Sequence, residues 1–415
     1  MAEIPIEFLL FAFTLLGVAL WHHRTLEIAA SGLLAITLYK LLFGSFRGAA
    51  GLDGLAAHLS HEWVIVANLA CLLLGFALLS RHFEKSHVPL ALPHVLPDDW
   101  RGAFLLLAIV FVLSSFLDNI AGALIGGAMA RSLFKKLHIG YLAAIVAASN
   151  AGGAGSVVGD TTTTMMWIDG VAPQAVFPAY VAALTALFVF GFPASRQQQR
   201  YSPIVKDVEH RPNIDWIRVG IVVAILVAAI GANVIVNVNF ADLADTFPFI
   251  GVAVWVVILL SAPIRRPDWH LLTEASRGTA FLLSLVIAAS MMPVEQLPAP
   301  SWHTAFGMGF VSAVFDNIPL TKLALDQGGY DWAVLAYCVG FGGSMIWFGS
   351  SSGVALSNLF PQARSVGAWI RHGWYVPVAY VVGFFVMLGL LGWHPQSSRR
   401  AGPHQPQPEI STVRR

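Results

Sequence analysis

The stretch SNAGGAGSVVGDTTTTMMW, residues 149–167, lies between two apolar runs at 141–148 and 175–192. It contains four glycines, one aspartate and four consecutive threonines. Inside a bilayer every backbone N–H and C=O group needs a partner, so irregular backbone is tolerated there only where it is buried in protein or lines a cavity. The stretch therefore predicts a membrane helix that is interrupted by a polar, buried segment.

The composition of the whole chain is that of a polytopic helical membrane protein. Of its 415 residues, 57% are hydrophobic and 11% are charged, whereas about 25% are charged in an average soluble protein. The net charge of +1 predicts no nucleic-acid partner. The two cysteines, Cys71 and Cys338, lie in apolar runs and indicate neither a disulfide nor a metal cluster, so we expect no cofactor.

Apolar runs long enough for a membrane span recur along the chain, and other apolar regions are interrupted. The full-length runs are 4–21, 26–43, 63–80, 175–192, 217–238, 248–262, 277–292 and 374–392. The interrupted regions are 102–131, 141–168, and the pair 302–325 and 332–357. The first run follows acidic residues without a basic one, so we interpret it as a span and not as a cleavable signal.

The distribution of basic residues predicts the topology. If residues 81–101 face the cytoplasm, the loops on that side hold 17 of the 24 Lys and Arg residues, as the positive-inside rule requires. This assignment holds only if 102–131 and 302–325 each enter and leave from one side of the membrane. Both regions are therefore predicted to be re-entrant hairpins.

The two halves of the chain repeat one pattern. FLDNIAGAL (116–124) matches FDNIPLTKL (315–323) at an offset of 198, and GGAGSVVGDTTT (152–163) matches GGSMIWFGSSSG (342–353) at an offset of 190. The order is the same but the starting side is opposite, which indicates an inverted-topology repeat. Such repeats are typical of secondary transporters, whose sites lie near the bilayer midplane at discontinuous helices.

We divide the chain accordingly into two repeats, a linker and a tail. The predicted units are repeat 1 at 1–194 (scaffold helices 1–80, transport part 100–192), a cytoplasmic linker at 195–216, repeat 2 at 217–392 (scaffold helices 217–292, transport part 302–392), and a polar tail at 393–415. The fold class is all-α, with two re-entrant hairpins and two broken helices.

Polar residues at the two breaks are the first candidates for a site. Asp160 stands where a half-helix would begin, and an aspartate there can simply cap the helix. The matching residue of the second repeat is Ser350, so capping does not require a charge. An ionisable group at membrane depth is costly and functional by default. The glycines that permit unusual dihedrals and close approach at the breaks are Gly152, Gly153, Gly159, Gly342, Gly343 and Gly349.

The hairpin tips carry the same dipeptide, Asp118-Asn119 and Asp316-Asn317. Asp-Asn is a good turn former, which is the simpler interpretation, but its use in both repeats favours a functional role. Lys322 follows the second tip and precedes Asp326 by four residues. We expect these two residues to form an i,i+4 ion pair near the outer interface.

These motifs resemble the ion transporter superfamily. Within it, SNAGGAGSVVGDTTTTMMWI and GGSMIWFGSSSGVAL resemble the two broken-helix stretches of NhaD-type sodium/proton antiporters, and the likeness covers most of residues 100–390. The superfamily also includes arsenite permeases and the symporters of the citrate transporter-like families. The hairpin tips of the dicarboxylate branch carry neutral Ser-Asn-Thr, unlike the Asp-Asn found here. The resemblance implies a homodimer in which hairpins and broken helices move against a scaffold, as in an elevator.

The acids favour a cation as cargo. Two unit charges 4 Å apart interact by about 4 kcal/mol at an effective dielectric of about 20, so three carboxylates without a basic partner would repel a dianion. Na⁺ at Asp118, Asp160 and Asp316 would gain oxygen ligands, and desolvation lets a proton compete for the same carboxylates. We therefore predict exchange of Na⁺ (or Li⁺) for H⁺ in a bacterial cell membrane. The candidate site residues are Asp118, Asn119, Asn150, Asp160, Thr161, Thr162, Asp316, Asn317, Ser350 and Ser351.

Alternative functions stay open at this point. A Na⁺- or H⁺-coupled symporter of citrate, a dicarboxylate or another anion could use the hairpin aspartates as sodium ligands. An intramembrane aspartyl protease also pairs buried aspartates, but residues 155–160 read GSVVGD and lack the Gly-x-Gly-Asp spacing. We expect no enzyme, and the buried acids disfavour a non-transporting scaffold protein.

Overall fold

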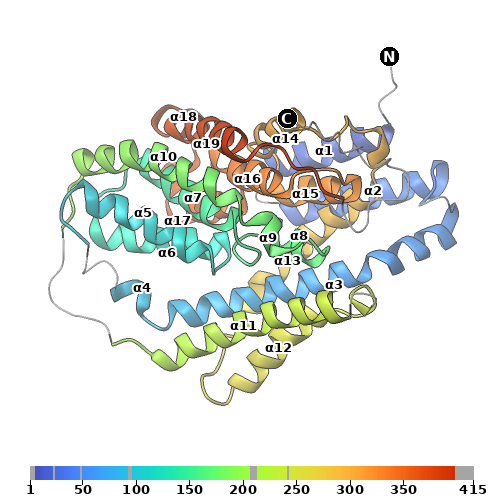
Figure 1. The fold of residues 1–415 in the computed structure, drawn as a ribbon, viewed down its shortest axis with the longest axis horizontal. Helices are drawn as coiled ribbons and strands as arrows, with labels where there is room; N and C mark the ends of the chain where they lie inside the picture. The colour runs from blue at the N-terminus through green and yellow to red at the C-terminus, as the bar shows by residue number, and fades with distance from the viewer. Residues whose placement is uncertain are drawn as a thin grey trace, which may run out of the picture.

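The computed structural model describes residues 5–21, 24–46, 49–91, 96–205, 213–240 and 243–397. These residues form helices joined by loops, and the β-structure among them consists of isolated bridges such as the one between Phe134 and Ile204 (Figure 1). A membrane protein whose backbone must satisfy its own hydrogen bonds adopts this all-helical solution. The predicted helical fold class is thereby confirmed.

Each full-length apolar run lies on one helix. These helices are α1 (Ile6–Leu20), α2 (Thr25–Phe43), α3 (Gly51–Glu84), α10 (Ala179–Tyr201), α11 (Trp216–Asn239), α12 (Phe249–Ser261), α13 (Leu271–Ser290) and α19 (Tyr375–Leu391). By length and composition, five helical segments of the described residues could cross a membrane, and a sixth could if α18 (Val366–His372) and α19 form one bent span. The chain is a multi-pass membrane protein.

Two helices extend well beyond their apolar runs. Helix α3 begins at Gly51 and spans 34 residues, although its apolar run covers only 63–80. Helix α10 continues to Tyr201, six residues past position 195 where the predicted linker begins, so the first part of that segment is helical. Polar residues at a helix end lie outside the apolar run but still continue the backbone hydrogen bonds, so hydropathy alone sets the boundary too early.

The interrupted regions form helix pairs separated by short turns or breaks. The first hairpin is α5 (Trp100–Ser114) and α6 (Asn119–Leu133), and the second is α14 (Trp302–Ser312) and α15 (Asn317–Gln327). The first broken helix is α7 (Ile139–Ala154) and α8 (Thr161–Ile168). The second comprises α16 (Trp332–Gly342), the 3₁₀ turn η4 (Gly343–Met345) and α17 (Ser351–Leu359). Both interruptions lie where the sequence predicts them.

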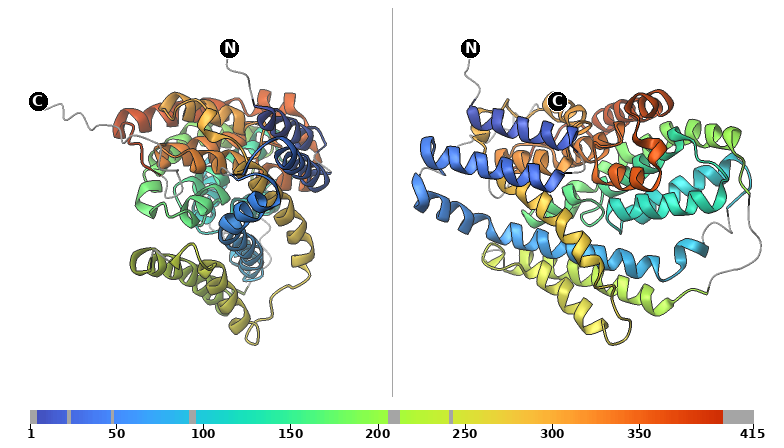
Figure 2. Two further views of the ribbon diagram at one scale, coloured as in Figure 1. Left: turned by 90° about the vertical axis from the view of Figure 1, so that its right-hand side faces the viewer. Right: turned by 180° about the vertical axis from the view of Figure 1, so that it is seen from behind.

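The two halves interlock around the broken helices. Helix α8 packs against α15 of the other half, α17 packs against α6, and the closing helices α10 and α19 pack together. Helix α3 instead packs against α11, α12 and α13. Both Figure 1 and Figure 2 place α11 and α12 on the opposite side of α3 from the hairpin α5–α6. The hairpins and broken helices thus pack mainly with one another, while α15 also contacts α13 and α8 also contacts α3.

Loops that the sequence assigns to one side of the membrane meet in the structure. Asp215 accepts from Arg265 at 2.8 Å, and its backbone N–H donates to the Ser86 carbonyl at 2.9 Å, which joins three of the basic loops. The rings of His138 and His372, from two others, lie 4.9 Å apart. At the other end, segments near residues 330 and 396 form a β-bridge. These contacts agree with the grouping of loops inferred from charge.

Candidate functional site

Close packing explains the glycines at the two breaks. A Cβ atom on Gly152 would lie 2.0 Å from the Phe111 carbonyl oxygen of α5, and one on Gly342 would lie 2.3 Å from the Gly309 carbonyl oxygen of α14. Neither glycine is among those with positive φ in the described chain. The expectation of unusual dihedrals is therefore wrong, and close approach is the reason. Each of six glycines would place a Cβ within 2.7 Å of a backbone oxygen: Gly152, Gly153, Gly159, Gly342, Gly343 and Gly349.

Asp160 lies at the centre of the polar interior, at the start of α8. Its carboxylate makes no capping bond to the α8 backbone. Instead, Oδ1 accepts from the Asn119 amide at 2.9 Å, and both carboxylate oxygens lie 3.3 Å from the Asn317 amide nitrogen. The side chain is 1% exposed. One carboxylate is therefore held by the asparagines of both hairpin tips.

The hydroxyl groups of α8 complete this arrangement. Thr161 donates to Asp160 at 3.3 Å, and Asn317 also donates to the Thr162 hydroxyl at 2.8 Å. The carboxylate at the start of α8 thus has amide and hydroxyl neighbours on several sides.

Asn150 connects α7 to the second broken helix. Its amide donates to Ser344 at 2.9 Å and to Ser350 at 3.1 Å, and its carbonyl oxygen accepts from Ser352 at 2.8 Å. All four side chains are fully buried or nearly so. Asn119 also donates to the Asn150 carbonyl oxygen at 3.1 Å. The polar groups of the two halves therefore form one continuous hydrogen-bonded network.

The two hairpin aspartates have different surroundings. Asp316 caps α15 by accepting from the Ile318 N–H at 3.1 Å, and its second oxygen accepts from Ser351 at 3.0 Å. Asp118 faces the Asn119 and Ile120 N–H groups at the start of α6, but the contact is too weak to count as a capping hydrogen bond. Asp316 and Ser351 also line a cavity of about 230 Å³ whose wall reaches Thr25. The capping interpretation thus applies in part to Asp316, whose other oxygen faces the second broken helix.

The three aspartates form a chain of like charges. Asp160 interacts electrostatically with both Asp118 and Asp316. Among the described residues, no group of three acidic, histidine or cysteine side chains is close enough to hold one metal ion. The three carboxylates therefore lie in a row, with Asp160 in the middle, and do not converge on a single point. Any cation between them would draw its remaining ligands from amide, hydroxyl or carbonyl oxygens.

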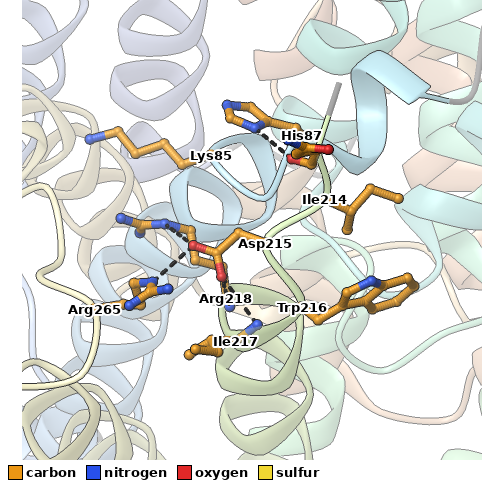
Figure 3. Close-up of a pocket in the computed structure, with 9 residues that line it drawn as sticks. Lys85, His87, Ile214, Asp215, Trp216, Ile217, Arg218 and Arg265 are labelled. Carbon is orange, nitrogen blue, oxygen red and sulfur yellow. Dashed lines mark hydrogen bonds and ion pairs between the residues drawn. The ribbon is translucent and has the colours of Figure 1, made fainter. Parts of the chain in front are cut away.

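A second, larger cavity contains an acidic residue from a loop, whose surroundings differ from those of Asp118, Asp160 and Asp316. It measures about 650 Å³ and is lined by Lys85, His87, Asp215, Arg218 and Arg265, as Figure 3 shows. The Arg265 hydrogen bond holds the pKa of Asp215 below its ordinary value. In the described part of the chain, the loop acids Asp215 and Asp268 form ion pairs with Lys or Arg residues. Within that part, Asp118, Asp160 and Asp316 form none.

Sequence reasoning missed several members of the network. Ser352 is the repeat counterpart of Thr162, which was named, so the repeat offset alone could have identified it. Ser344 follows the second pair of break glycines and has no polar counterpart in the first repeat. Gly340 lies where a Cβ would meet the Asp160 carboxylate at 2.9 Å. No local sequence signal marks that contact, because the two residues are 180 positions apart.

This arrangement defines a class: a helical membrane protein with two hairpins, two broken helices and a buried acidic centre. Comparison with curated proteins finds sodium/proton antiporters. The chain is 28% identical to sodium/proton antiporter 1 of Arabidopsis thaliana over 65% of its length, and 26% identical to antiporter 2 of that plant over 60%. It is 24% identical to the Na⁺/H⁺ antiporter NhaD of Alkalimonas amylolytica over 68% of its length. The expected resemblance to NhaD-type antiporters is therefore confirmed.

The likeness has a defined extent. The aligned part covers 53% of Arabidopsis antiporter 1 and 67% of each of the other two relatives. The chain thus spans about half the length of the first of these relatives. No family model matches the chain, so the citrate transporter-like assignment stays a prediction.

Proposed function

We propose that this protein is a secondary transporter that exchanges Na⁺, or Li⁺, for H⁺ across a cell membrane. The observation that carries the proposal is Asp160, a carboxylate 1% exposed whose hydrogen-bond partners are the neutral Asn119, Asn317 and Thr161. A buried carboxylate without a basic partner is costly as an anion. It is stabilised either by a proton or by a metal cation.

The chemistry of the neighbouring groups favours a hard cation over an anion. Amide, hydroxyl and carboxylate oxygens are the ligands that hard cations prefer. The Asp160 carboxylate and the Thr161 and Thr162 hydroxyl oxygens are such ligands, and the Asn119 and Asn317 amides, which now donate to Asp160, would turn their carbonyl oxygens toward a bound ion. An anion at the same place would face Asp118, Asp160 and Asp316, and it would need basic groups, which do not pair with these three aspartates in the described chain. The names of the aligned relatives, sodium/proton antiporters, agree with this choice.

Competition for one carboxylate is sufficient for exchange. If Na⁺ and H⁺ occupy Asp160 in turn, neither crosses with the other, and the gradient of one ion drives the other in the opposite direction. The movement is proposed to be of the elevator type, in which the interlocked hairpins and broken helices shift against α3, α11 and α12. We further propose a homodimer in a bacterial cell membrane.

The experiment is proton flux in proteoliposomes that contain the purified full chain. An imposed pH gradient should collapse on addition of Na⁺ or Li⁺ and persist with K⁺ at the same ionic strength. Empty liposomes and the Asp160→Asn protein are the controls. Accumulation of labelled citrate or succinate driven by Na⁺, without cation-dependent proton flux, would show instead that the protein is an anion symporter.

A further inference from the structure

A buried ion-pair cluster lies outside the candidate site. The Lys322 ammonium group is 3.0 Å from Glu62 Oε2 and 2.7 Å from Asp326 Oδ1. The Lys322 and Glu62 side chains are each 1% exposed, and that of Asp326 is 10% exposed. The pair with Asp326 confirms the sequence prediction, whereas Glu62 comes from α3 and was not foreseen.

The two carboxylates play different structural roles. Asp326 is on the same helix as Lys322, four residues on, so this pair moves with α15 as one body. Glu62 is 260 residues away in sequence, on a helix that packs mainly with the long helices. Burying a second carboxylate beside an ammonium group already paired carries a desolvation cost. The cost suggests a role for Glu62 beyond neutralising Lys322.

Helix α3 is held to its own neighbours by polar contacts along its length. His58 contacts the Ser290 hydroxyl of α13 at 2.9 Å, and Asn68 accepts from the Gly251 N–H of α12 at 3.0 Å. Near its end, His82 contacts Arg218 of α11 at 2.9 Å. Glu62 lies between the first two of these contacts, so its position is set by the long helices.

Helix α15 connects Lys322 directly to the candidate site. The helix has 11 residues, and its first residue, Asn317, donates to Asp160 and Thr162. Lys322 follows five residues later on this short, rigid element. A contact that fixes Lys322 against α3 therefore fixes the distance from the second hairpin tip to the long helices.

We propose that Lys322 is a positioning residue for transport: through Glu62 it ties the second hairpin to α3 in the conformation where Asp316 lines the 230 Å³ cavity. This inference rests on the proposed function. Apolar contacts between α15 and α13 are non-directional and allow sliding, but an ion pair requires one geometry. The Lys322–Glu62 pair separates when the hairpin moves, and it re-forms when the hairpin returns.

The test uses accessibility of the cavity as a readout of conformation. Ala355 lines this cavity, so the full chain with Cys71→Ser, Cys338→Ala and Ala355→Cys provides one reporter thiol. Its labelling rate by a maleimide in detergent is measured with and without Glu62→Gln. We expect Glu62→Gln to slow labelling at least threefold, because the state with the open cavity loses its ion pair.

Transport kinetics and matched variants separate positioning from simple stability. In proteoliposomes, Glu62→Gln should change the maximal Na⁺-dependent rate at least threefold and change KM for Na⁺ less than twofold. Glu62→Asp, which keeps the charge, should fall between Glu62→Gln and the parent in both assays. Asp326→Asn, which leaves the cross-helix pair, should alter labelling less than twofold.

Two outcomes would overturn the inference. One is a Glu62→Gln protein with parental labelling and parental transport rate. The other is an Asp326→Asn protein that slows labelling as much as Glu62→Gln does, because the effect would then come from the charge balance of Lys322 and not from the contact with α3. Labelling does not require transport, so absence of Na⁺/H⁺ exchange in the parent would refute the proposed function, while the labelling comparison would still decide whether Glu62 fixes the hairpin.

Discussion

The two broken helices are interrupted at similar glycine-containing stretches but carry different polar groups. Each break is packed against a hairpin through glycines, and each second half-helix begins at a residue with extended backbone, Asp160 in the first half and Ser350 in the second. Ser350 caps its helix by accepting from the Gly353 N–H at 3.3 Å, whereas the Asp160 side chain does not cap α8. Two residues at equivalent positions therefore do different work.

The first half-helices, α7 and α16, also carry different residues at corresponding positions. Asn150 in α7 corresponds to Gly340 in α16 by the repeat offset. Asn150 reaches Ser350, while Gly340 leaves space for the Asp160 carboxylate. In each contact a large polar side chain therefore meets a smaller residue: Asn150 meets Ser350, and Asp160 meets Gly340. The comparison teaches that similar interruptions in the two halves carry different chemistry, with the carboxylate at the start of α8 and a serine at the start of α17.

The largest expected effect is that of Asp160→Ser, which makes the first half like the second. Removing a buried charged group loses interactions worth about 1.5–3 kcal/mol, and each 1.4 kcal/mol is a factor of about ten. We predict that the Na⁺-dependent proton flux falls about a hundredfold or more, while the melting temperature changes by only a few degrees. Flux in proteoliposomes and thermal unfolding in detergent measure the two effects.

The double variant Asp160→Ser with Ser350→Asp sharpens this comparison. It keeps the number of carboxylates but moves one to the position that faces Asn150. Because Gly340 leaves room only beside position 160, the double variant should not recover transport. Recovery of more than half of the parental flux would show that the two positions are interchangeable.

The hairpin tips provide a prediction of intermediate size. Asp118→Asn and Asp316→Asn remove a charge with little change in shape, and asparagine is also a good turn former and cap. The proteins should fold, and cation-driven proton flux should fall about tenfold in one or both, because the tip aspartates lie beside the Asp160 centre and their loss should cost about 1.5 kcal/mol, the lower end of the range for a charged group. Titration of flux against Na⁺ concentration is the measurement. Parental flux in both would leave the tips as turn formers alone.

The smallest expected effect is that of Ser350→Ala in the second half. Loss of an N-cap costs about 1 kcal/mol, so the melting temperature should fall by a few degrees. Transport per folded molecule should change less than threefold, because Asn150 keeps its bonds to Ser344 and Ser352. A loss of transport as large as that of Asp160→Ser would mean that the halves contribute equally to ion binding.

Much of the framework follows from the sequence for local reasons. The apolar runs specify helices because a membrane span needs about 20 apolar residues. The breaks are visible because glycine and polar residues interrupt those runs. The hairpin tips are visible because Asp-Asn is a turn signal that recurs in both halves. Helix ends were less certain, as α3 and α10 show, because polar residues can continue a helix beyond the apolar stretch.

The sequence by itself determined a multi-pass helical membrane protein, two interrupted helices, two polar turns and a short set of acids at membrane depth. These features depend on hydropathy, turn chemistry and spacing, which act within tens of residues. Only the tertiary structure decided which groups meet. It placed both tip asparagines on Asp160, joined Asn150 to three serines of the other half, and paired Lys322 with Glu62. Each of these contacts depends on how helices cross, because packing between elements far apart in the chain sets the distances, and no local pattern of residues encodes them.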